Sequence, residues 1–93
     1  MKHAGSEALS TLAPVLNELR RIAGLTERKP GIFYRGGVAF VHFHEDPAGL
    51  FADLKRDGRF ARFPVNDATE RGTLVAAARA ALVDAATTSR TRP

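Results

Sequence analysis

The stretch VAFVHFHEDPAGLFADLK, residues 38–55, has the alternation that decides the fold. Successive side chains of a strand point to opposite faces of a sheet, so residues of one face recur at every second position. Residues 38–44 and 50–55 each show this period, and the proline and glycine of residues 45–49 are typical of a turn between them. We therefore expect a β-hairpin at the centre of the chain.

Turn signals place a further strand on each side of this hairpin. Residues 32–35 come before it across Gly36 and Gly37, a pair that tolerates the positive φ of a tight turn. Residues 59–65 follow it across Asp57 and Gly58, which is a strong hairpin signal. Residues 26–31 read as a loop by composition. The strands are therefore expected to form a four-stranded antiparallel meander.

Helical periodicity flanks the strands. From Thr11, apolar residues recur at intervals of three and four, and Pro14 falls in the first turn, where a missing N–H costs little. An alternative start at Ser6 would bend this helix near the proline. After the strands, Asp67 can cap a second, alanine-rich helix, and Glu70 completes a pair resembling a capping box.

These elements predict an α+β fold in the order helix, four-stranded antiparallel β-meander, helix, with the helices packed on one face of the sheet. The predicted boundaries are a flexible N-terminus over residues 1–10, a single domain over 11–86, and a disordered basic tail over 87–93. Two helices can cover only one face of such a sheet. We expect the other face to meet water, a ligand or a second copy of the chain, and favour a homodimer through the sheet.

Composition excludes several classes of function. The 93 residues contain no cysteine, which excludes disulfides, thiolate catalysis and cysteine-rich zinc modules. No apolar run approaches the roughly 20 residues of a membrane helix. The N-terminus does not read as a secretory signal, so we expect a cytoplasmic protein with no membrane partner. The net charge is +4, but Lys2, Arg90 and Arg92 in the expected tails supply most of the excess.

Two histidines share one face of the central strand. Val38, Phe40, His42 and His44 alternate with Ala39, Val41 and Phe43. One hairpin register sets His42 opposite Ala52 on the core face, and the register shifted by one residue sets it on the open face with Asp53. We favour the open face, because two histidines inside a small core would need polar partners that this chain can hardly supply. There the histidines are expected to stack on Phe40.

The His-x-His pair makes a metal site one candidate. Side chains at i and i+2 lie about 6–7 Å apart at the backbone, so both rings can converge on one ion. Asp53 on the next strand is the best-placed third ligand, and Glu45 is a further candidate. The ion would be a divalent metal such as zinc, although the leading expectation is a chain without a cofactor. Histidine could also act as a general base, but no convincing nucleophile accompanies it, so an enzyme is not expected.

A nucleic-acid surface is a third candidate. Aromatic side chains interleaved with basic ones on a sheet can stack bases and neutralise phosphates. The candidate residues are Tyr34, Arg35, Lys55, Arg56 and Arg62. Core aromatics flanked by solvated arginines explain the same pattern, so we do not expect nucleic acid as a partner.

The segments PGIFYRGGVAFVHFHEDPAGLFADLK, residues 30–55, and RFPV, residues 62–65, resemble a small family of bacterial proteins of unassigned function. The resemblance implies a stand-alone bacterial domain and brings no activity with it. The order of elements is also loosely similar to small double-wing domains linked to DNA binding, which is an analogy of fold alone. The sequence thus favours a non-catalytic binding module that dimerises through its sheet. A metal or histidine site at His42, His44 and Asp53, and weak nucleic-acid binding, are the alternatives.

Overall fold

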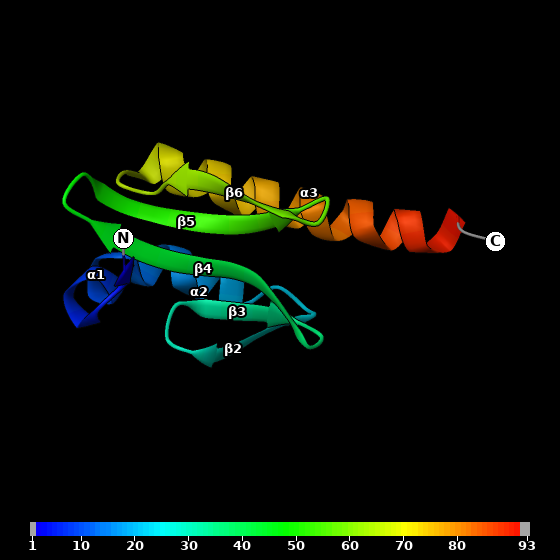
Figure 1. Ribbon diagram of the computed structural model, residues 1–93, viewed down its shortest axis with the longest axis horizontal. Coiled ribbons are helices and arrows are strands. Elements are labelled where there is room, and N and C mark those ends of the chain that lie inside the picture. The colour runs from blue at the N-terminus through cyan, green and yellow to red at the C-terminus, as the bar shows by residue number, and fades with distance from the viewer. Residues whose placement is uncertain (1, 92–93) are drawn as a thin grey trace.

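The computed structural model describes residues 2–91, with side chains through residue 83. It is an α+β structure with an antiparallel sheet and three helices, which confirms the predicted class (Figure 1). The elements in chain order are β1 (Lys2–His3), α1 (Ser6–Thr11), α2 (Ala13–Arg20), β2 (Leu25–Lys29), β3 (Ile32–Arg35), β4 (Val38–Asp46), β5 (Gly49–Arg56), β6 (Arg59–Pro64) and α3 (Ala68–Thr91).

The sheet has more strands than the four predicted. Its order is β2-β3-β4-β5-β6, so consecutive strands are neighbours, and β1 adds to β4. Strand β2 occupies most of the segment that composition marked as a loop, because pairing with β3 compensates for a sequence that is almost entirely polar. Strand β1 lies in the segment predicted to be flexible. It takes the edge of β4 at His44 and Glu45, beyond the first residue of β3, Ile32, which pairs with His42.

The N-terminal helical segment is divided at Leu12. Helix α1 begins at Ser6, and Pro14 stands in the first turn of α2. The alternative start therefore describes the structure, and a helix beginning at Thr11 does not. Because proline lacks an N–H and its ring occupies the space of the preceding turn, one continuous helix through this point is disfavoured.

Helix α3 begins as the sequence predicts. The Asp67 carboxylate accepts a hydrogen bond from the Glu70 N–H at 2.7 Å, and the Glu70 carboxylate accepts one from the Asn66 N–H at 2.8 Å. The helix continues to Thr91, past residue 87 where a disordered tail is predicted, as the high helix propensity of its many alanines allows. Residues 92–93 of that predicted tail lie outside the described residues.

One hydrophobic core lies between the sheet and the helices. Figure 1 shows the helices behind the sheet, and residues of α2 and α3 share one buried cluster with the inner sheet face. The largest fully buried side chains are Phe33, Phe43, Leu12, Leu19, Leu54, Leu74, Val15, Val41 and Val65. Within residues 2–91, no helix is long and apolar enough to cross a membrane.

A β-bulge changes the alternation of β4. Phe33 pairs with Val41 and Tyr34 pairs with Ala39, so Phe40 is an extra residue on β4. Phe40 and Val41 are both buried, at 5% and 0% exposure. The expected common face of Phe40 and the histidines is therefore wrong, because the bulge places Phe40 in the core cluster.

Candidate metal-binding site

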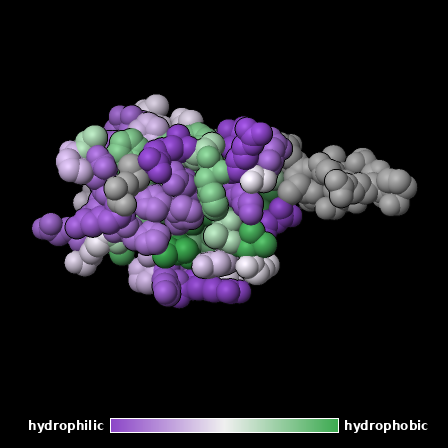
Figure 2. All heavy atoms as spheres, in the orientation of Figure 1, coloured by the Kyte–Doolittle hydropathy of each residue, from purple (hydrophilic) through white to green (hydrophobic). Residues whose placement is uncertain are grey.

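The register of the central hairpin places the histidine pair on the outer sheet face, the face turned away from the core. His42 pairs with Asp53, His44 pairs with Phe51, and Phe43 between them pairs with Ala52. Phe43 and Ala52 are buried. The structure thus confirms the open-face register. Hydrophilic residues dominate this face, with apolar groups among them (Figure 2).

The two imidazoles of β4 are in direct contact. Nδ1 of His42 lies 2.6 Å from Nε2 of His44, and the ring planes stand at 89° to each other. Such a contact needs one nitrogen with a proton and one with a free lone pair, so the two rings cannot both be protonated at these atoms. At least one lone pair is therefore directed into the space between the rings.

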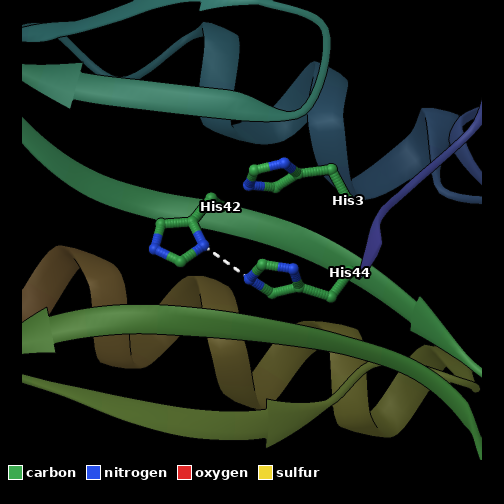
Figure 3. Close-up of side chains that lie close together, drawn as sticks. All are labelled: His3, His42 and His44. Carbon is green, nitrogen blue, oxygen red and sulfur yellow. Dashed lines mark hydrogen bonds between the residues drawn. The ribbon is translucent and has the colours of Figure 1, made fainter. Parts of the chain in front are cut away.

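The third histidine comes from the N-terminus. His3 in β1 pairs with His44 across the strands, and its ring stacks on that of His44 with centroids 5.0 Å apart. Its centroid lies 6.0 Å from that of His42. One potential ligand nitrogen from each of the three rings lies within 4.8 Å of the other two. Figure 3 shows the three rings grouped over β4, with His3 entering from β1.

Asp53, the third ligand expected from the sequence, is occupied by another partner. The Arg62 guanidinium donates two hydrogen bonds to its carboxylate, at 2.9 and 3.1 Å. That guanidinium holds the pKa of Asp53 below its usual value. The carboxylate also lies 3.3 Å from Nε2 of His44. Asp53 is thus beside the three-histidine group as a neighbouring anion, and it contacts the same His44 nitrogen that faces His42.

Glu45, the other expected ligand, faces the N-terminal segment. Its carboxylate contacts the Lys2 ammonium at 3.2 Å and accepts a hydrogen bond from the Gly5 N–H at 3.1 Å. The Gly5 hydrogen bond, and then the Lys2 contact, lower the pKa of Glu45. The carboxylate therefore fastens the segment that carries His3.

The surroundings favour neutral imidazoles. Burial lowers the pKa of His42, and the positive charge of a protonated His44 would lower it further. Burial also lowers the pKa of His44, against the opposing effect of the Asp53 carboxylate. Metal ligation requires an unprotonated ring nitrogen, so these shifts reduce competition from protons near neutral pH.

One aromatic side chain borders the group. The ring of Phe60 in β6 lies 4.7 Å from that of His42, and Phe60 is 47% exposed. This residue, and not Phe40, is the aromatic neighbour of the histidines. The Lys55 ammonium lies over the Phe60 ring, 5.9 Å from its centre.

The candidate nucleic-acid residues come from three strands, β3, β5 and β6. Tyr34 in β3 lies under the Arg28 guanidinium, 4.5 Å from its ring centre. Arg62 is engaged by Asp53, while Arg35 and Arg56 stand at the last positions of β3 and β5. Tyr34 pairs with Ala39, and Lys55 follows Leu54, the partner of Val41, so both lie toward the start of β4 and the histidines lie further along that strand.

Sequence reasoning missed His3. Two neighbouring ligands could be found from strand alternation, but the N-terminal segment has no periodicity that predicts where it lies. No protein family, characterised protein or solved structure was found to match this chain. The candidate site therefore depends on its geometry alone.

Proposed function

We propose that this chain is a small module that binds one divalent transition metal ion through His3, His42 and His44. The observation that carries the proposal is the convergence of three imidazoles from two strands, with ligand nitrogens within 4.8 Å of one another. Around a tetrahedral zinc ion, ligand nitrogens stand about 3.3 Å apart. The 2.6 Å contact of His42 and His44 would open by less than 1 Å, which rotation of the rings can supply.

The donor set defines the class of ion. Neutral imidazole nitrogen suits zinc, copper, nickel and iron, whereas magnesium and calcium prefer oxygen ligands. Three protein ligands leave a fourth tetrahedral position for water or a small anion. We propose binding of the ion itself as the function, with water or a small anion at the fourth position.

Zinc titration of untagged protein at pH 7.5 tests this proposal. Competition against a chromophoric chelator should show one equivalent bound, and His3→Ala, His42→Ala and His44→Ala should each weaken binding by at least about tenfold. Glu27→Gln is the control, because Glu27 pairs with Arg20 away from the histidines and its loss should leave zinc affinity unchanged. Less than a tenth of an equivalent bound by the wild-type protein would overturn the proposal.

A homodimer through the outer sheet face is a second proposal. Helices α2 and α3 contribute to the core on the inner face, and the outer face presents Phe60 at 47% exposure. Covering this ring would remove apolar area from water. Light scattering should give twice the chain mass, and Phe60→Glu should give a single chain. A single chain for the wild-type protein at high micromolar concentration would rule out the dimer.

A further inference from the structure

The N-terminal strand that carries His3 makes few contacts with the rest of the molecule. Strand β1 has two residues, both exposed, paired with His44 and Glu45. The Ala4 N–H donates to the Phe43 carbonyl at 3.1 Å and continues the pairing by one hydrogen bond. A ladder this short contributes little to stability, because a few hydrogen bonds must offset the entropy of ordering the segment.

Glu45 adds the side-chain contacts that hold this segment. One carboxylate oxygen accepts the hydrogen bond from the Gly5 N–H, and the other meets the Lys2 ammonium. The two contacts lie on either side of His3 in the chain. Glu45 is also the next residue after His44 on β4, so the metal ligand and the residue that fastens the third ligand share one short piece of strand.

We propose that Glu45 is a positioning residue for the metal site, acting by docking residues 2–5 against β4 and so bringing His3 to the ion. This inference rests on the proposed metal-binding function. Because binding and docking are linked, the ion in turn stabilises the docked segment. The N-terminal segment therefore acts as a closing arm, held at one point by Glu45 and at another by the ion.

Zinc affinity of Glu45→Gln tests the inference. The substitution keeps the size of the side chain but removes the charge that meets Lys2 and weakens the acceptor for Gly5. We expect affinity to fall by roughly three- to tenfold, the effect of losing modest, partly exposed interactions. Asp46→Asn is the matched control. The Asp46 carboxylate accepts a hydrogen bond from the Ala48 N–H in the following turn, so affinity should stay within about twofold of wild type.

The His3→Ala background separates positioning from a general structural role. If Glu45 acts through His3, Glu45→Gln should change zinc affinity by less than about twofold once His3 is absent. An undiminished effect in that background would overturn the inference, as would wild-type affinity of the single variant. Glu45→Ala, verified by circular dichroism, provides a second variant with the same expected pattern.

Amide hydrogen exchange gives an independent readout. Zinc should slow exchange of the Gly5 N–H in the wild-type protein, and the slowing should be smaller in Glu45→Gln. Equal slowing in both proteins would contradict a role for Glu45 in docking the arm. Failure of the wild-type protein to bind zinc would instead refute the proposed function on which the inference rests.

Discussion

Replacing His44 with leucine should leave folding stability almost unchanged or raise it. The His44 side chain is only 12% exposed, and within the described residues its buried Nδ1 has no hydrogen-bond partner. An unsatisfied buried polar atom costs about 1–3 kcal/mol. The contacts of Nε2 with His42 and Asp53 return about 0.5–1.5 kcal/mol each, and leucine keeps most of the buried apolar area.

The expected change in the free energy of unfolding for His44→Leu is therefore within about 1 kcal/mol of zero. Phe43→Ala, at the neighbouring position of the same strand, provides the contrast. Phe43 is 1% exposed in the core, and its truncation should cost about 3–5 kcal/mol. A histidine that stability does not require, placed beside two others, is more readily explained by function than by packing.

Urea unfolding at pH 8, followed by circular dichroism with a chelator present, measures both changes. At this pH the imidazoles are neutral, so the comparison excludes their protonation. The reasoning would be refuted if His44→Leu lowered the free energy of unfolding by more than about 2 kcal/mol while the slope of that free energy against urea concentration stayed as in the wild-type protein. It would mean that the polar contacts of His44 stabilise the fold by more than their burial costs.

Two further predictions concern the imidazoles and a turn. Without metal, the free energy of unfolding should fall as pH drops below about 6.5. The pKa values of His42 and His44 are lower in the folded protein than in the unfolded chain, so the unfolded chain binds protons at a higher pH and is stabilised by them. Urea unfolding between pH 8 and 5 should show this fall in the free energy of unfolding. A double variant with glutamine at both positions should lose most of the pH dependence, and an equal dependence in wild type and variant would exclude these rings as its source. Gly31→Ala should destabilise by more than Gly36→Ala in thermal unfolding, where equal losses would contradict the reasoning. Both glycines have positive φ, which costs about 1–2 kcal/mol for alanine, but only at Gly31 would the new Cβ meet Leu9, at 2.8 Å.

Strand alternation was sufficient to predict the central hairpin. The period of two located β4 and β5, and the cost of burying two histidines chose the register that sets His42 opposite Asp53. Phe40 was misplaced because alternation assumes one residue per pairing step, and a bulge breaks that assumption without a clear mark in the sequence.

The edges of the sheet and the third ligand could not be predicted in the same way. Strand β2 has the composition of a loop and becomes a strand only by pairing with β3. His3 lies beside His44 because the N-terminal segment contacts residues 40 or more positions away, among them Glu45. Such contacts are tertiary, so local periodicity contains no information about them.

The bulge at Phe40 separates two tasks within one strand. Before the bulge, Val38 and Ala39 pair with the last two residues of β3 next to the turn. After it, the side chains of residues 41–44 point alternately into the core and to the outer face, where the two imidazoles lie. An insertion or deletion in the turn at Gly36 and Gly37 can be absorbed at the bulge, whereas a single-residue deletion between Val41 and His44 would turn an imidazole inward. Length variation should therefore be tolerated on one side of Phe40 and not on the other, which makes the β3–β4 turn the place to graft new loops onto this domain.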